Sequence, residues 1–384
     1  MRLWPTRRRP LPPTLPSGDV MVLGDVLRRN VDDLLAVDDN GERNGVFLFR
    51  GRLAITPARA LEILRERFGR FGYTPYIRQA RGGVLVQAWP TAIVKEHSRI
   101  TLNVVLFALT ILSTLLAGTQ FVGSPTFDAL RHSGWWRWLL SGVPFAATLL
   151  LTLGVHEFGH YFAARYYGVS VSLPYFIPVP PLFFLSFGTL GAVIRMRSPT
   201  PDKNALFDIA AAGPIGGLLI AVPALLLGIH WSAVVPVVPG TTSVTFGDSA
   251  LIHWLLSLRF GGVPSGMRLY SHPMFDAAWV GLLVTALNLM PVGQLDGGRI
   301  AYALFGPRHR AVGIVTFVAL ITLGIITWSP NWVVWALFIF LVVGFQHGPP
   351  LDDVTPLTPG RRVVGWACLI LLVLLLPPIP IDIG

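Results

Sequence analysis

Charged residues are scarce in this sequence. Only 13% of its 384 residues are Asp, Glu, Lys or Arg, whereas 53% are hydrophobic. Soluble domains carry about a quarter charged residues, so this composition excludes an ordinary soluble globular protein and favours an integral membrane protein in a lipid bilayer. Cysteine is nearly absent too. Cys368 alone cannot form an intrachain disulfide, nor can it supply a zinc site built from several thiolates.

Acidic residues are fewer than basic ones, and the formal net charge is +10. A basic balance can indicate nucleic-acid binding, and the triplet Arg7-Arg8-Arg9 would fit that interpretation. However, no basic element with interleaved aromatic residues and no nucleic-acid-binding motif accompanies the triplet. We therefore predict no nucleic-acid partner and assign the triplet to a tail near anionic lipid headgroups.

The N-terminal quarter of the chain differs in pattern from the rest. Residues 1–20 are rich in Pro and Arg and are predicted to be disordered. Residues 21–95 are predicted to form a small soluble α+β module. Within this module the apolar pattern predicts helices at 20–37 and 57–68. It also predicts a strand at 46–49 and a hairpin of two strands at 76–79 and 84–89.

Residues 100–380 are predicted to form the membrane domain, because their apolar runs approach the roughly 20 residues that cross a bilayer. The predicted fold is a polytopic α-helical membrane protein with about seven transmembrane helices, at 100–120, 141–165, 205–228, 273–292, 311–328, 332–347 and 363–379. The segment 172–194 is apolar but broken by prolines, so we expect a re-entrant hairpin packed against protein. An apolar piece at 250–260 is expected at the membrane interface.

Basic residues between the predicted helices give the orientation. With the N-terminus inside, the cytosolic flanks carry Arg81, Lys95, Arg99, Arg165, Arg195, Arg197, Lys203, Arg299, Arg308, Arg310, Arg361 and Arg362. The outer flanks carry Arg131, Arg137, Arg259 and Arg268. Lys and Arg concentrate on the cytosolic side of membrane proteins, so the N-terminus is predicted to be cytosolic.

One motif, His156-Glu157-Phe158-Gly159-His160, places charge inside an apolar run, and Glu157 is the only glutamate after Glu96. A carboxylate at bilayer depth costs about 2.5–3.5 kcal/mol on insertion scales and marks a functional site. Histidines four apart on a helix face one direction, so His156 and His160 can supply two nitrogen ligands to Zn²⁺. Glu157 can act as base toward a zinc-bound water, and Gly159 allows close approach of a helix or substrate.

A catalytic zinc needs a third protein ligand and an open position. Asp296, in the stretch 288–298, is the candidate, because Pro291 breaks the helix and the following glycines permit irregular backbone. Asp208 is a weaker alternative ligand, more typical of capping or local pairing. No catalytic role is assigned to His253, His272 or His347.

Simpler interpretations exist for each of these groups. The two motif histidines could be polar residues satisfied within a helical bundle, although this leaves Glu157 unpaired in apolar surroundings. Asp296 taken alone could be a helix-end residue that faces water.

Together the two motifs, including Asn288-x-x-Pro291-x-x-x-Leu295-Asp296-Gly297, resemble the site-2 protease (peptidase M50) family of intramembrane metalloproteases, over residues 141–310. The resemblance implies that His156, His160 and Asp296 hold one Zn²⁺ per chain, that Glu157 is the catalytic base, and that substrates are transmembrane helices. Gly188-Thr189-Leu190-Gly191 resembles the glycine-containing membrane hairpin of the family, and residues 212–217 resemble its tightly packed core helix.

Shorter stretches resemble one branch of that family, the plastid and cyanobacterial ethylene-dependent gravitropism-deficient and yellow-green type. They are Phe49-Arg50-Gly51-Arg52-Leu53, Phe207-Asp208-Ile209-Ala210 and His272-Pro273. Some members of this branch have lost the H-E-x-x-H motif, whereas this chain retains it.

We therefore expect a zinc-dependent intramembrane endopeptidase that hydrolyses peptide bonds in or near transmembrane segments of membrane-protein substrates. Unwound substrate backbone cannot be satisfied by lipid, so we expect β-addition at a strand edge containing Gly188 and Gly191, with Asn288 as a side-chain donor. An inactive metal-holding scaffold and an ion or solute transporter stay open as alternatives. The expected location is the plasma (inner) membrane of a bacterium or a thylakoid-like membrane; the sequence does not specify an oligomeric state.

Overall fold

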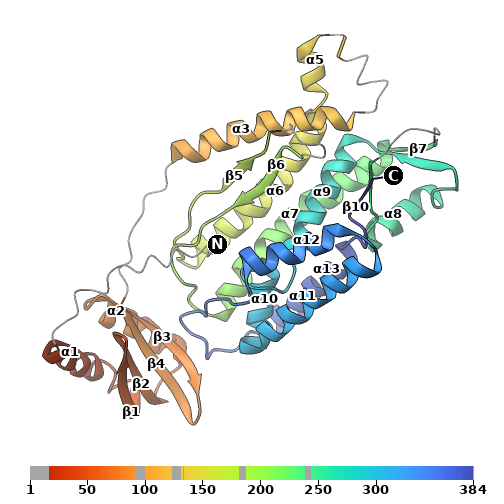
Figure 1. The fold of residues 1–384 in the computed structure, drawn as a ribbon. Helices are drawn as coiled ribbons and strands as arrows, with labels where there is room; N and C mark the ends of the chain where they lie inside the picture. The colour runs from red at the N-terminus through yellow and green to blue at the C-terminus, as the bar shows by residue number, and fades with distance from the viewer. Residues whose placement is uncertain are drawn as a thin grey trace.

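The structure, a computed structural model, describes residues 17–90, 100–122, 131–132, 134–180, 187–237 and 244–383. They form a small N-terminal module and a helical bundle, with the module at one end of the bundle (Figure 1). Most of the predicted tail at 1–20 lies outside the described residues, and α1 (Ser17–Arg29) begins within it.

The N-terminal module contains α1, α2 (Pro57–Gly69) and a four-stranded antiparallel sheet in the order β1-β2-β4-β3. The strands are β1 (Leu35–Arg43), β2 (Val46–Leu53), β3 (Tyr73–Ala80) and β4 (Gly83–Pro90). Pro57 suits the first turn of α2, where a backbone N–H is not needed. The face of α2 that carries Leu64 and Phe68 is fully buried against Ile77 and Val86 of the sheet.

Each of the seven segments predicted as helices in the bundle is largely helical. The bounds are α3 (Ile100–Gly118), α6 (Val143–Tyr166), α7 (Lys203–Trp231), α9 (Pro273–Asn288), α11 (His309–Ile326), α12 (Pro330–Phe338) and α13 (Pro359–Leu375). Three more helices are α5 (Trp135–Leu140), α8 (Ala250–Phe260) and α10 (Asp296–Phe305). The apolar piece at 250–260 is thus a helix, whereas α10 was not predicted as a separate one.

Four helical stretches among the described residues are long and apolar enough to cross a membrane, judged by length and composition: Ile100–Phe121, Trp135–Tyr166, Lys203–Trp231 and Asp296–Ile326. Such stretches place the chain among integral membrane proteins. Shorter apolar helices accompany them at Ala250–Phe260, Pro273–Asn288 and Pro330–Val343.

The centre of the bundle is formed by α6, α7 and α9. Phe145 and Leu149 of α6, Leu225 of α7 and Trp279 of α9 belong to one buried apolar cluster. Glycine lets α6 and α7 approach closely: a Cβ atom on Gly159 would lie 2.5 Å from the carbonyl oxygen of Ala212. The close approach predicted at Gly159 is therefore confirmed, and the neighbour is α7.

The segment 172–194 contains two short antiparallel strands, β5 (Tyr175–Pro178) and β6 (Thr189–Val193), which lie between α3 and α6 (Figure 1). Residues 181–186 lie outside the described residues. Two side chains of α3 hold the pair: Asn103 Nδ2 donates to the Pro174 carbonyl at 2.8 Å, and Ser113 Oγ donates to the Gly188 carbonyl at 2.7 Å.

Four further short strands form two antiparallel pairs away from the site. β7 (Ala233–Pro236) pairs with β9 (Met267–Tyr270), and β8 (Val244–Phe246) pairs with β10 (Ile381–Ile383).

Candidate metal and catalytic site

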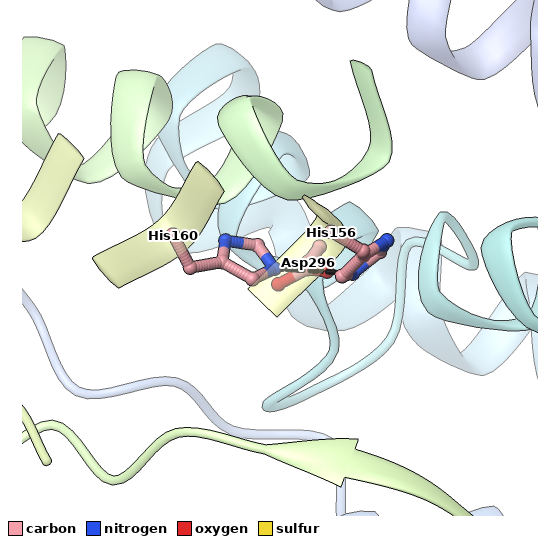
Figure 2. A group of neighbouring side chains, drawn as sticks. All are labelled: His156, His160 and Asp296. Atoms are coloured by element: carbon pink, nitrogen blue, oxygen red, sulfur yellow. Dashed lines mark hydrogen bonds and ion pairs between the residues drawn. The ribbon is translucent and has the colours of Figure 1, made fainter. Parts of the chain in front are cut away.

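The predicted metal ligands come from two helices. His156 and His160 lie one turn apart on α6, and Asp296 is the first residue of α10. Their exposed fractions are 3%, 4% and 8%, and Glu157 is 7% exposed. Figure 2 shows the two imidazoles and the carboxylate pointing toward one another. Asp296 and His160 are 136 positions apart in the sequence, and the fold brings their side chains into contact.

The distances between the three donor atoms match a metal site. Nε2 of His160 lies 3.2 Å from Nε2 of His156 and 3.1 Å from Oδ2 of Asp296. Nε2 of His156 lies 3.4 Å from the same oxygen. Tetrahedral ligands about 2.0–2.1 Å from a zinc ion are about 3.4 Å apart, so the donor triangle has the size of one face of such a tetrahedron.

The hydrogen bond on the far side of His160 fixes which nitrogen carries a proton. Nδ1 of His160 lies 2.6 Å from the carbonyl oxygen of Ile209 on α7. A carbonyl only accepts, so Nδ1 donates and Nε2 of the neutral ring presents a lone pair. That lone pair faces the Asp296 carboxylate and the His156 ring. A cation between them removes the repulsion, so the residues present fit a zinc ion.

Glycines in the chain after α9 bring Asp296 into position. Gly293 has φ +49, a conformation that side chains with a Cβ atom rarely adopt. A Cβ atom on Gly297 would lie 1.9 Å from the Leu289 carbonyl oxygen, and one on Gly298 would lie 2.4 Å from the Gly293 carbonyl oxygen. The start of α10 therefore packs directly on the preceding loop, which holds the Asp296 carboxylate beneath α6.

Glu157 lies beside the three donor side chains and near the hairpin. The backbone of Ile194, the residue that follows β6, lies near its carboxylate. The neighbouring Phe158 is 38% exposed and belongs to the outer face of α6. Glu157 thus lies near both the donor triangle and the end of β6, where a carboxylate could act on a water molecule at a bound metal.

The residues predicted to bind substrate have different surroundings. Asn288, the last residue of α9, has its Nδ2 atom 3.4 Å from Nε2 of His156, so it borders the site. Gly188, with φ +78, packs on α3, where a Cβ atom would lie 2.5 Å from the Ser113 carbonyl oxygen. Gly191 of β6, with φ +100, is buried, but a Cβ atom there would meet no atom within 4 Å.

Asp208, the weaker alternative ligand, is paired elsewhere. Its carboxylate accepts hydrogen bonds from Arg361 Nε at 2.7 Å and Nη2 at 2.6 Å, and from the Tyr167 hydroxyl. Among the described residues, the one group of His, Cys, Asp and Glu side chains arranged to hold a metal is His156, His160 and Asp296. Asp208 therefore joins α13 to α7, as local pairing predicted.

The three histidines without an assigned role lie in other environments. His272 caps α9, accepting at Nδ1 from the Met274 backbone N–H at 3.2 Å. His253 is near Asp248, and the His347 ring packs on Tyr302.

Two contacts of the site were missed by sequence reasoning. One is the Ile209 carbonyl described above. The other is Gly213 on α7, where a Cβ atom would lie 2.1 Å from Nε2 of His160. The stretch 212–217 was predicted as a tightly packed core helix, but the pattern gives no signal that its packing partner is the ligand ring.

Comparison with known proteins agrees with this geometry. The model of the family described as Peptidase family M50 matches residues 144–326, which include both ligand-bearing helices. The chain is similar to this family over those residues. This match confirms the resemblance predicted from the two motifs.

Curated relatives extend the match. The probable zinc metalloprotease EGY2, chloroplastic, of Oryza sativa subsp. indica is 29% identical over 387 residues, covering 93% of this chain and 67% of that protein. EGY1, chloroplastic, of Arabidopsis thaliana is 32% identical over 245 residues, which cover 62% of this chain and 43% of that protein. EGY3, chloroplastic, of Oryza sativa subsp. japonica is 30% identical over 306 residues, which cover 73% of this chain and 48% of that protein. The chain thus spans between 43% and 67% of the length of these relatives, and the predicted branch is confirmed.

Proposed function

We propose that this protein is a zinc-dependent endopeptidase that hydrolyses peptide bonds in or near the transmembrane segments of membrane-protein substrates. The observation that carries the proposal is the buried donor triangle of His156, His160 and Asp296 with Glu157 beside it. A carboxylate next to three metal ligands inside an apolar bundle is costly to keep without a catalytic or binding role.

Each residue of the site has a role in this proposal. His156, His160 and Asp296 would hold the zinc ion, which supplies a Lewis acid and an activated water when bound. Glu157 takes the proton from the attacking water and passes it to the nitrogen of the leaving amine. The Glu157 carboxylate lies near the Ile194 backbone, which follows β6, so the proposed base is on the hairpin side of the site.

The substrate would bind as an extended strand along β6. Among the described residues β6 pairs only with β5, and its end lies next to Glu157. A transmembrane helix that unwinds in lipid exposes backbone groups, and a strand edge satisfies them. Leu190 is 77% exposed and Val193 is 51% exposed, so both can contact an apolar substrate. Gly191 leaves room beside the strand, and Asn288 would donate to a substrate carbonyl.

We place the N-terminal module and the ligand-bearing end of the bundle on the cytosolic side of the membrane. The distribution of Lys and Arg along the sequence supports this orientation. Lys203, at the start of α7, contacts Asp353 beside the module, so a basic flank and the module share one end of the bundle. The chloroplastic relatives favour a thylakoid-like membrane. In this division residues 1–20 are the tail, 21–95 the module and 100–380 the membrane domain, with its catalytic core at 141–310.

The substitution Glu157→Gln tests the proposed function. We expect purified variant protein in lipid vesicles to keep its zinc content, because the three ligands are unchanged. Cleavage of a single-pass membrane substrate should fall by a factor of about 10²–10⁴, the usual contribution of a general base. Zinc content is measured by elemental analysis and cleavage by mass spectrometry of the fragments. Equal cleavage by the variant and the wild-type protein would remove Glu157 from the reaction, and no cleavage by either would favour the scaffold alternative.

A further inference from the structure

The sheet of the N-terminal module continues into the membrane domain. The backbone N–H of Ile77 on β3, an edge strand, donates to the Leu351 carbonyl at 2.7 Å, and the Asp353 N–H donates to the Ile77 carbonyl at 2.9 Å. On its other side, the Leu351 N–H donates to the Thr200 carbonyl at 2.9 Å. Residues 351–353, here called the shared strand, therefore lie between the module and the chain that leads into α7.

The shared strand also contributes to the core of the module. Leu351 is 2% exposed and belongs to the same apolar cluster as Leu61, Leu64 and Ile77. Asp352 is fully buried, and its Oδ1 atom accepts from the Val354 N–H at 2.8 Å, which turns the chain after the strand. Separation of the module from the bundle would expose Leu351 to water, so docking of the module and order of the shared strand depend on each other.

The side chain of Asp353 connects the shared strand to the metal site. Its Oδ2 atom accepts from the Tyr302 hydroxyl at 3.0 Å, and Tyr302 lies on α10, whose first residue is Asp296. Its Oδ1 atom lies 3.2 Å from Lys203 Nζ, and the same Nζ donates to the Asp353 carbonyl at 2.7 Å. Lys203 begins α7, the helix whose Ile209 carbonyl orients the His160 ring.

The remaining contact between the module and the bundle is incomplete. A cleft of about 320 Å³ lies between α2 and the bundle, lined by Ala58, Leu61, Glu62 and Arg65 on one side and by Pro201 and Asp202 on the other. Among the residues that the structure describes, no helix or strand of the module packs closely on one of the bundle, so the shared strand is the contact through which a change in the module can reach the bundle.

We propose that the N-terminal module is a positioning element for the metal site. Docking on the shared strand fixes the position of Asp353, and Asp353 holds Tyr302 through its hydroxyl. Because Tyr302 lies on α10, this contact sets the position of α10 along its axis and therefore that of the Asp296 carboxylate. Six residues of helix span about 9 Å, so a shift at Tyr302 reaches Asp296 through one rigid segment. Metal sites require ligand distances within about 0.2 Å, which makes zinc binding sensitive to such a shift. This inference depends on the proposed role of Asp296 as a metal ligand.

Two substitutions in the full-length protein distinguish release of the module from the resulting shift of α10. Leu351→Asp buries a charge in the module core and should release the module, whereas Tyr302→Phe removes only the hydroxyl that contacts Asp353. We expect Leu351→Asp to increase amide hydrogen exchange in both β3 and α10 of the metal-free protein. Tyr302→Phe should increase exchange in α10 alone. The apparent zinc dissociation constant, from chelator competition in lipid vesicles, should rise about tenfold in each variant, as is typical of changes outside the ligand set.

Matched controls change the same groups at exposed positions. Tyr166→Phe removes a phenolic hydroxyl from a side chain that is 83% exposed, and Val22→Asp adds a charge to the module at a side chain that is 64% exposed. Both should leave exchange and zinc affinity unchanged. Because the effects share one route, Leu351→Asp combined with Tyr302→Phe should weaken zinc binding no more than Leu351→Asp alone.

The positioning role is wrong if exchange in β3 rises in Leu351→Asp while exchange in α10 and zinc affinity stay at wild-type values. Unchanged exchange in β3 would overturn the docking contact itself. Absence of zinc binding by the wild-type protein would contradict the proposed function instead. The exchange experiments on the metal-free protein would still decide whether the module and α10 are coupled.

Discussion

The His160 imidazole is held at three points. Its Nδ1 atom donates to the Ile209 carbonyl, its Nε2 atom faces the Asp296 carboxylate, and the backbone of Gly213 lies against the ring. Two of these contacts come from α7, which supplies no ligand of its own. At the scale of single residues, the ligand geometry therefore depends on atoms that no sequence motif for metal binding would include.

Gly213→Ala tests this dependence. The added methyl group would lie 2.1 Å from Nε2 of His160, so the ring must move out of the donor triangle. We expect zinc affinity to fall about 10–100-fold, as measured by chelator competition. Gly360→Ala is the control, because a Cβ atom there meets no atom within 4 Å. Wild-type zinc affinity in Gly213→Ala would show that α7 does not constrain the ligand.

Asp296→Asn tests the ligand from the other helix. The amide has nearly the shape of the carboxylate, so we expect the fold and melting temperature to persist. Zinc occupancy should be lost at concentrations that saturate the wild-type protein, because a neutral oxygen is a much weaker zinc ligand than a carboxylate. Elemental analysis of the purified variant checks this, and full occupancy would mean that another group completes the site.

Most of the candidate site was predictable from the sequence for a simple geometric reason. The spacing of His156 and His160 fixes their relative direction on a helix, and Pro291 with the glycines that follow indicates irregular backbone that can turn the Asp296 carboxylate toward a metal. The Ile209 carbonyl was not predictable, because which backbone atom of α7 faces the ring depends on the helix crossing. The roles of Gly188, Gly191 and Asn288 in substrate binding stay predictions.

At the scale of elements, α10 is the helix that the sequence pattern did not predict. Residues 288–298 predicted an irregular loop, but the short helix after it was not anticipated, because it is followed closely by α11 (His309–Ile326). The helix predicted over 20–37 was too long. It ends at Arg29, and Leu35–Arg43 forms β1. Val31, Leu34 and Leu35 are all buried and repeat with helical spacing, so pairing with β2, not local pattern, decides the structure there.

Gly297→Ala tests the packing of α10 on its preceding loop. A Cβ atom would lie 1.9 Å from the Leu289 carbonyl oxygen, a backbone atom that cannot rotate away. We expect a lower melting temperature in lipid vesicles together with loss of zinc affinity, since α10 and Asp296 must move as one body. Gly360→Ala serves again as control. A variant that binds zinc and melts like the wild-type protein would contradict the proposed rigidity of this loop.

At the scale of the whole molecule, the shared strand joins the N-terminal module to the helical bundle. Composition and apolar run length predicted the division into a module and a membrane domain, because each body buries its own kind of surface. The contact between them was not predictable, since β3 and the shared strand lie far apart in the chain and no side-chain pattern marks the backbone hydrogen bonds that pair them. The hairpin pairing of β5 with β6 was partly foreseeable from the prolines that exclude a spanning helix at 172–194.

Hydrolysis by Glu157 is proposed to require one zinc ion, which His156 and His160 of α6 and Asp296 of α10 would hold. The most direct test combines zinc content with cleavage of a transmembrane substrate by the full-length protein in lipid vesicles, before and after chelation. We predict one zinc ion per chain, loss of both zinc and cleavage on chelation, and recovery of both when Zn²⁺ is restored. Cleavage that persists in the zinc-free protein would contradict the account.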